Sequence, residues 1–245
     1  MPLRIAFDLD GVLADMESEL VSQAEQLFGE AMTTRLQERT DEPLSVSPDA
    51  VAAAPPADAY VPPVLKMNMT SRQTRRLWQH VESLENFWEG LRELESGTVK
   101  RLAGIAAERR WEIIFLTKRP ETAGATAQVQ TQRWLQAHGF TLPSVYVVQR
   151  SRGRIAAALD LDIVVDDRPE NCLDVVVDSK ARAILIWRED EAQLPPAARR
   201  LGVGVVSSVA ECLDILTKVD PAEQNRPNVL ERLRRLFGLA NEPVK

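Results

Sequence analysis

The chain has 245 residues, 44% of them hydrophobic, which is enough for one full hydrophobic core and a second, smaller unit. Its formal net charge of −6 argues against a general nucleic-acid or anionic-membrane binder, because such proteins are usually basic. Two cysteines, Cys172 and Cys212, are too few for a disulfide framework, and no run of 18 or more apolar residues could span a bilayer. We therefore expect a soluble, cytoplasmic protein with neither a membrane nor a nucleic-acid polymer as its partner.

Six short apolar runs, rich in Ile and Val, each end at a polar or turn-like step. They lack the alternation of strands that have one face in solvent, which indicates strands covered on both faces. Helix-like segments lie between the runs, so we expect an α/β protein with a mostly parallel sheet. The expected strands are 3–7, 111–116, 144–148, 161–165, 182–187 and 203–206.

Three segments between or after these strands have the patterns of helices. In 98–110 the apolar residues are spaced by three to four. The segment 126–139 closes on a glycine, which is typical of a helix end. The last segment, 208–219, follows the final strand, and Ser207 or Ser208 is its expected N-cap.

One connection is far longer than the others. From Asp8 to Thr117 is 109 residues (117 − 8), whereas a strand–helix–strand unit needs about 30. An insertion therefore follows the first strand, with expected helices over 15–29 and 71–94. The segment 43–63 between them holds six of the 15 prolines and should form a loop or an extended arm, because proline fixes φ and lacks an amide donor.

We expect three units in the chain. Residues 1–14 and 96–220 form the core domain, and 15–95 form the helical insertion. Residues 221–245 form a C-terminal helical extension, because 227–240 has its leucines on one side of an amphipathic helix.

Two strand ends carry pairs of aspartates. Asp8 and Asp10 follow the first strand, and Asp166 and Asp167 follow the fourth. In open α/β sheets, ligands bind beyond the carboxyl ends of the strands. Burying four carboxylates together is costly without a cation, so we expect a hard divalent ion, Mg²⁺, with substrate phosphate and water completing its shell.

A hydroxyl and cations follow at another strand end. Thr117, Lys118 and Arg119 come directly after the second apolar run and can hold the anionic oxygens of a substrate. Carboxylates, a hydroxyl and positive charge together are typical of phosphoryl-transfer sites. Further cations precede the second aspartate pair: Arg150, Arg152 and Arg154.

The motifs "DLDGV", "FLTKRP", an arginine segment and "VVDDRPEN", in this order, resemble those of the haloacid dehalogenase (HAD) superfamily of phosphatases. The resemblance covers roughly residues 3–215. It implies a HAD-like Rossmannoid three-layer sandwich with a mostly parallel sheet, and a helical cap over the active site, inserted after the first strand.

The resemblance also implies roles for individual residues. Asp8 matches the nucleophile that becomes an aspartyl-phosphate. Asp10 matches the general acid/base, and its carbonyl matches a Mg²⁺ ligand; its presence favours phosphoryl chemistry over dehalogenation. Thr117 matches the hydroxyl that binds the phosphoryl group. Asp166, with Asp167 beside it, matches the remaining Mg²⁺ ligands.

The third motif departs from the family, because arginines stand where a lysine is usual. We favour Arg152 for this role, since it lies at the start of the expected helix. Arg150, Arg154 and Lys118 remain candidates. An arginine keeps the charge but contacts phosphate as a planar fork.

Residues 84–122 look like the cytosolic 5′(3′)-deoxyribonucleotidase group and its bacterial relatives. That likeness implies that Phe87 and Trp88 face the substrate and help to hold a base. The alternative is that both aromatic side chains belong to the core of the insertion, packed with Trp78 and Leu84.

These observations predict an Mg²⁺-dependent phosphatase that hydrolyses a small phosphorylated metabolite through an aspartyl-phosphate, with a nucleoside monophosphate as one candidate substrate. A phosphosugar phosphatase or a phosphomutase of the same superfamily is one alternative. A HAD-fold binding or regulatory protein without turnover is another, and the missing motif lysine favours it.

Overall fold

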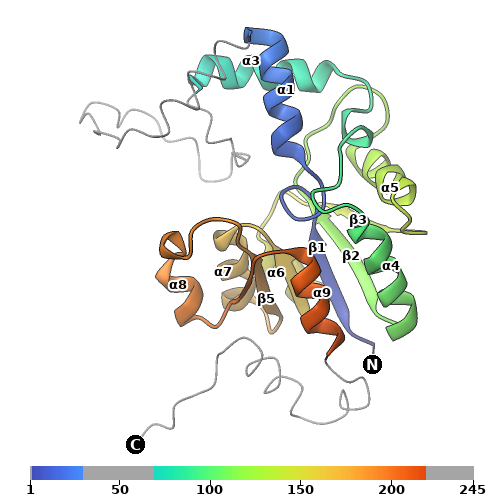
Figure 1. Cartoon of the computed structure of the whole chain (residues 1–245), viewed down its shortest axis with the longest axis vertical. Helices are drawn as coiled ribbons and strands as arrows, with labels where there is room; N and C mark the ends of the chain where they lie inside the picture. Colours follow the sequence, from blue (N-terminus) through green and yellow to red (C-terminus); the bar gives the residue numbers. More distant parts are fainter. Residues whose placement is uncertain (1, 30–68, 219–245) are drawn as a thin grey trace, which may run out of the picture.

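The centre of the fold is one sheet of parallel strands, in a computed structural model that describes residues 2–29 and 69–218 (Figure 1). The strand order is β3-β2-β1-β4-β5-β6, so β1 lies between β2 and β4. All six expected strands are confirmed. Their bounds are β1 Arg4–Asp8, β2 Glu112–Thr117, β3 Ser144–Val147, β4 Ile163–Asp166, β5 Arg182–Ile186 and β6 Gly204–Val206.

Helices connect the strands and cover both faces of the sheet, so the core has three layers (Figure 1). The described helices are α1 Met16–Phe28, α3 Ser71–Ser83, η1 Phe87–Glu89, α4 Thr98–Arg109, α5 Ala127–Ala137, α6 Arg152–Ala158, α7 Pro169–Asp178, η2 Glu191–Gln193, α8 Pro196–Arg200 and α9 Val209–Thr217.

Every strand except β3 contributes side chains to two hydrophobic clusters. In β1, Ile5 and Phe7 belong to the cluster that contains α4, α5 and α9, whereas Ala6 belongs to the cluster with α6, α7 and α8. All three side chains are fully buried. Successive side chains of a strand point to opposite faces, so continuous apolar runs are what a sheet between two helical layers requires.

The helix expected over 71–94 is wrong in its second half, because α3 ends at Ser83. Asn86 has a left-handed backbone, with φ 53°. Its N–H donates to the Ala123 carbonyl (2.8 Å), and its side-chain oxygen accepts from the Ala125 N–H (2.9 Å). These contacts with the loop after β2 outweigh the local helical pattern.

The insertion between β1 and α4 leaves and rejoins the core at one place. The Asp15 N–H donates to the Arg92 carbonyl, and the Leu94 N–H donates to the Leu13 carbonyl, each at 2.9 Å. The two connecting segments therefore run side by side, and α1 and α3 lie beyond one end of the sheet (Figure 1).

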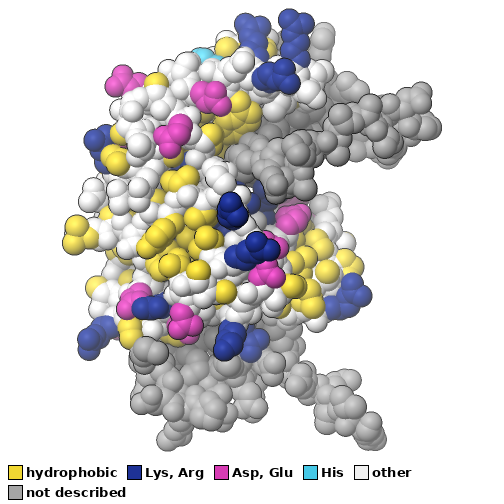
Figure 2. Space-filling view, turned by 180° about the vertical axis from the view of Figure 1, so that it is seen from behind, with side chains coloured by type: hydrophobic (Ala, Val, Ile, Leu, Met, Phe, Trp, Pro, Cys, Tyr) yellow, Lys and Arg dark blue, Asp and Glu magenta, His cyan; other side chains and the backbone are white. Residues whose placement is uncertain are grey.

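Two expected segments, 43–63 and 221–245, lie outside the described residues. Within 2–29 and 69–218, no helix combines the length and apolar character needed to cross a membrane. On the rear face, charged side chains of both signs lie close together near the middle, with hydrophobic patches on either side (Figure 2).

Candidate active site

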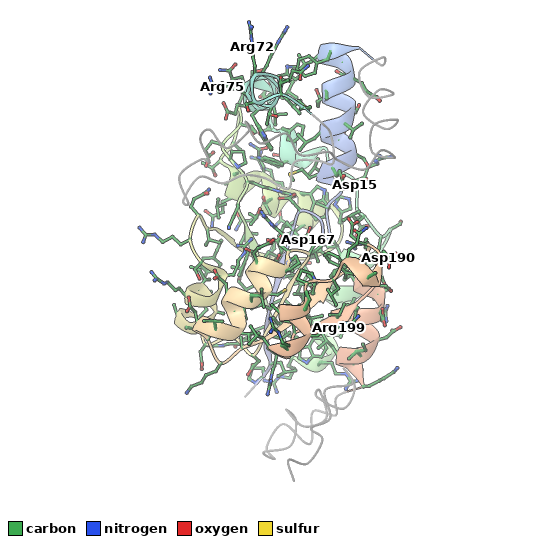
Figure 3. All side chains as sticks on the ribbon, turned by 90° about the vertical axis from the view of Figure 1, so that its left-hand side faces the viewer. Asp15, Arg72, Arg75, Asp167, Asp190 and Arg199 are labelled. Carbon is green, nitrogen blue, oxygen red and sulfur yellow. The ribbon has the colours of Figure 1, made fainter. Side chains whose placement is uncertain are left out.

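Three neighbouring strands bring polar side chains to one edge of the sheet. Asp8 ends β1, Thr117 ends β2 and Asp166 ends β4, and β1 pairs in parallel with both other strands. All three side chains are buried. Asp167 lies at this end of the core, on the side facing the base of α1, where Asp15 lies (Figure 3). The predicted motif residues thus converge in space.

Arg152 joins two of these carboxylates. It opens α6 with 1% of its surface exposed, donates a hydrogen bond to Asp8 through Nη2, and has Nε 3.5 Å from Asp166 Oδ2. Its Nε and Nη1 are buried without a hydrogen-bond partner. Arg150 and Arg154 are exposed. Of the three arginines, only Arg152 therefore offers unused donors inside the site, and such donors suit an anion.

A second arginine holds Asp10. The Arg119 Nε lies 3.1 and 3.0 Å from the two carboxylate oxygens of Asp10, and its Nη2 lies 2.7 Å from Oδ1. The Thr117 hydroxyl donates to Asp10 Oδ2 at 3.2 Å. The sequence identifies Arg119 only as one of several cations, whereas the structure makes it the main partner of the predicted acid/base.

Asp166 is held by the start of α7. The Asn171 Nδ2 lies 3.0 Å from each carboxylate oxygen of Asp166, and the Arg168 N–H donates to Oδ1 at 2.9 Å. Asn171 is a site residue that the sequence reasoning missed. Its signal is its place in the first helical turn after Pro169, which brings it back over the end of β4.

These side chains surround a small pocket. Its volume is about 20 Å³ in this structure, which is room for about one water molecule. Five predicted site residues line it, whereas Thr117 and Asp166 are fully buried and do not line it. The lining residues are Asp8, Asp10, Lys118, Arg152, Asp167, Arg168 and Asn171.

The structure does not bring Phe87 and Trp88 to this pocket. Their rings pack edge to face with centroids 4.9 Å apart, and both side chains are buried in the core. The Trp88 indole N–H donates to the Pro120 carbonyl at 3.0 Å. Their packing therefore agrees with the alternative interpretation, in which both aromatic residues are part of the core.

Burial is the largest cause of the pKa shifts in the site. Burial raises the pKa of Asp8 well above its ordinary value; Arg152 opposes this rise, and the neighbouring carboxylates add to it. Burial and then Asp166 raise the pKa of Asp167 to about 8. Burial and the nearby Arg152 lower the pKa of Lys118. A further positive charge near Asp8 and Asp167 would therefore stabilise the ionised forms of both carboxylates.

The donor set fits Mg²⁺ in its chemistry. Among the described residues, no three His, Cys, Asp or Glu side chains form a ready-made metal cage. Mg²⁺ needs less than a cage, because it is usually bound by one or two carboxylates, with water and phosphate as its other ligands. Such an ion would stabilise the ionised forms of Asp8 and Asp167, whose pKa values are raised by burial and by neighbouring carboxylates.

A larger cavity of about 190 Å³ lies beside the small pocket and shares Asp167 with it. It is formed by the loop after β1, the first turn of α1 and the loop after β5. Met16 and Trp187 supply apolar surface, while Glu17 and Arg188 supply charge. The site therefore combines a small charged pocket with a roomier, mixed one.

No protein-family model and no curated protein sequence matches this chain. Solved structures do. A candidate β-phosphoglucomutase from Thermotoga maritima is 14% identical with a TM-score of 0.52, over 89% of this chain and 100% of that one. A hydrolase from Pseudomonas syringae is 15% identical with a TM-score of 0.48, over 89% and 99%. A haloacid dehalogenase-like family hydrolase from Xanthomonas campestris is 14% identical with a TM-score of 0.43, over 98% and 99%.

At such low identity, the Thermotoga likeness shows the fold and nothing finer. It extends over the whole of that chain. The other two TM-scores, below 0.5, are too low to carry an argument. Together with the six parallel strands and the helices on both faces, this likeness confirms the expected HAD-like Rossmannoid fold.

Proposed function

We propose that this chain is an Mg²⁺-dependent phosphatase of the HAD type that hydrolyses a small phosphomonoester. One observation carries the proposal: two carboxylates at a single strand end have separate buried arginines as partners. Asp8 pairs with Arg152, and Asp10 pairs with Arg119. Separate partners support separate tasks for the two carboxylates, one as nucleophile and one as acid and base.

In the first step, an Asp8 carboxylate oxygen bonds to phosphorus while the bond from phosphorus to the ester oxygen breaks. Asp10, in its protonated form, gives its proton to the departing oxygen, which leaves as an alcohol. The products are the free alcohol, an aspartyl-phosphate at Asp8 and an ionised Asp10.

In the second step, water attacks the phosphorus of the aspartyl-phosphate. Asp10 takes a proton from this water, and the bond between phosphorus and the Asp8 oxygen breaks. Inorganic phosphate leaves, Asp8 is an ionised carboxylate again, and Asp10 is protonated for the next turnover.

The transferred phosphoryl group needs positive charge on its oxygens. Arg152 supports this role through the unused donors Nε and Nη1, and Lys118 lines the same pocket, half-buried. In this proposal, Thr117 holds Asp10 through the hydrogen bond described above, and its contact with phosphate stays a prediction.

Asp8, the Asp10 carbonyl, Asp166 and Asp167 are the residues that would hold Mg²⁺. The ion, when bound, would stabilise negative charge on the phosphoryl oxygens. Asn171 and the Arg168 N–H would keep the Asp166 carboxylate in place.

The larger cavity is our candidate site for the organic part of the ester. It shares Asp167 with the small charged pocket, and it offers the Trp187 indole beside charged side chains. A phosphosugar or the ribose of a nucleoside monophosphate has hydroxyl groups for such a surface. The burial of Phe87 and Trp88 removes the main argument for a nucleotide in particular.

The proposal is tested by free phosphate release from about forty phosphomonoesters, with Mg²⁺ or with EDTA, by wild type and by Asp8→Asn. Nucleoside monophosphates, phosphosugars and p-nitrophenyl phosphate belong in the panel. Glu108→Gln, on the exposed surface of α4, is the matched control for loss of a carboxylate.

We expect Mg²⁺-dependent release by wild type and by the control, and none by Asp8→Asn, since no aspartyl-phosphate can form. Release by Asp8→Asn would reject Asp8 as nucleophile. Isomerised esters without free phosphate would indicate the mutase alternative. If a folded protein that binds Mg²⁺ released no phosphate from any ester, the binding-protein alternative would be favoured.

A further inference from the structure

Arg119 is enclosed in the protein with a single charged partner. Its side chain is 1% exposed. In the described part of the chain, Asp10 is the only carboxylate within ion-pair distance of its guanidinium. Three N–H contacts reach the two Asp10 oxygens, and Nη1 donates to the Thr131 hydroxyl at 2.9 Å. Asp10 therefore holds the guanidinium through Nε and Nη2, and Thr131 holds it through Nη1.

Two indole rings complete this enclosure. The centre of the Arg119 guanidinium lies 5.0 Å from the ring centroid of Trp88 and 6.0 Å from that of Trp134. Trp88 comes from η1 in the insertion, whereas Trp134 and Thr131 come from α5 in the core. Aromatic faces attract a guanidinium, most strongly where water is excluded.

Two hydrogen bonds hold Trp88 in place, one from its backbone and one from its side chain. Its backbone N–H donates to the Gln130 side chain at 3.0 Å, and its indole N–H donates to the Pro120 carbonyl at 3.0 Å. The ring has no exposed surface. A side chain so fixed is suited to support its neighbour and has no free face for a ligand.

We infer that Arg119 is a positioning residue for Asp10, and that Trp88 acts through Arg119. This inference rests on the proposed function and deepens it. The side-on contact with both carboxylate oxygens sets the orientation of the Asp10 side chain, which must reach the leaving oxygen and later the water. The nucleotidase likeness implies that Trp88 holds a base of the substrate. In this inference, Trp88 instead supports the orientation of the acid/base residue Asp10.

The test compares two kinds of ester, in order to distinguish a loss of proton delivery from a general loss of folded enzyme. An alkyl phosphate needs a proton on its leaving oxygen, whereas p-nitrophenolate leaves without one. We would measure the first turnover of Arg119→Met on the alkyl ester that the wild type turns over fastest, and the burst of p-nitrophenolate from p-nitrophenyl phosphate. Arg133→Met is the matched control, because Arg133 joins α5 to Glu89 of η1 by an exposed ion pair (3.0 Å) that does not involve Asp10.

We expect Arg119→Met to slow the alkyl ester by about 10²-fold, the typical cost of a misplacement of about 1 Å, while the p-nitrophenolate burst keeps its rate. Arg133→Met should leave both rates unchanged. In an Asp10→Asn background, Arg119→Met should cause no further loss on the alkyl ester, because its effect passes through Asp10. Trp88→Phe, which keeps an aromatic core side chain, should show the same preference for the aryl ester on a smaller scale.

Equal losses on the two esters would overturn the inference and leave the phosphatase proposal standing. So would a full additional loss in the Asp10→Asn background. If Arg119→Met does not fold, Trp88→Phe decides in the same way, and equal rates of that variant on both esters reject the inference. If the wild type hydrolyses none of the esters, the phosphatase proposal and this inference are overturned together.

Discussion

Gly153 in α6 lies against the backbone of Asp174 in α7. A β-carbon at position 153 would be 2.1 Å from the Asp174 carbonyl oxygen and 2.7 Å from its carbonyl carbon. Only a residue without a side chain permits this approach of the two helices. Because Arg152 is the adjacent residue, the contact also places the guanidinium that reaches Asp8.

We therefore predict that Gly153→Ala lowers both stability and activity. The methyl group must push α6 away from α7, at a cost of about 1–3 kcal/mol in the free energy of unfolding. Urea unfolding and phosphate release measure the two effects. Gly104→Ala in α4 is the control, since nothing lies within 4 Å of its β-carbon, and it should stabilise by up to about 1 kcal/mol. Equal stability changes in the two variants would contradict the prediction.

Arg152 is predicted to be needed for both folding and turnover. Arg152→Met leaves Asp8 and Asp166 without their buried cation, which should cost about 3–5 kcal/mol of unfolding free energy. Arg152→Lys keeps the charge but loses the planar fork, so it should recover more stability than activity. Chemical unfolding and steady-state rates would show this split. Arg154→Met, on the exposed side of α6, should behave as wild type, and a comparable loss there would refute the assignment.

Asp167→Asn should stabilise the metal-free protein while weakening its response to Mg²⁺. The raised pKa of Asp167, about 8, reflects burial and repulsion by Asp166, and an uncharged amide removes both costs. We expect a higher midpoint of thermal unfolding in EDTA, and a higher Mg²⁺ concentration for half-maximal phosphate release. Asp214→Asn, at an exposed ion pair of α9, is the control. A lower unfolding midpoint in EDTA would count against this prediction.

Glu95 is predicted to make the fold sensitive to acid. Burial alone would raise its pKa, but the N–H groups of Val209 and Ala210 and the Arg188 side chain outweigh burial and lower it. The ionised form is thus favoured in the folded protein, so this stabilisation is complete above the ordinary glutamate pKa, about 4.3, and is lost as the pH falls through the lower folded value. Glu95→Gln should be less stable than wild type at neutral pH and should lose less stability on acidification.

Urea unfolding of wild type and Glu95→Gln between neutral and acidic pH measures this difference. Glu108→Gln, which is exposed, should follow the wild-type curve. Parallel curves for wild type and Glu95→Gln would show that the hydrogen bonds to Val209 and Ala210 do not depend on the charge of Glu95.

The sheet was predictable from local sequence because its central strands are covered on both faces. Ile5, Ala6 and Phe7 need no alternation to identify them, since both clusters are apolar. The edge at which Asp8, Thr117 and Asp166 meet follows from parallel strands, whose carboxyl ends share one side of the sheet.

The partners of these carboxylates were less predictable. Lys118 and Arg119 are adjacent cations in the sequence, yet one lines the pocket and the other is sealed behind it. Their difference depends on Trp88 of η1 and Trp134 of α5, whose rings lie against the Arg119 guanidinium. Likewise, the left-handed turn at Asn86 depends on contacts with the loop after β2, which no local pattern shows.

The pair of hydrogen bonds between Leu13 and Leu94 and between Asp15 and Arg92 makes the insertion an exchangeable part. The chain leaves the sheet and returns to it at neighbouring residues, so a different segment can be joined at the same two points without moving a strand. A substrate preference carried by the insertion can then be inherited or engineered separately from the carboxylates beneath it. Trp88 is the exception, because it lies in the insertion and packs against Arg119, so an exchanged segment must keep an aromatic side chain at that place.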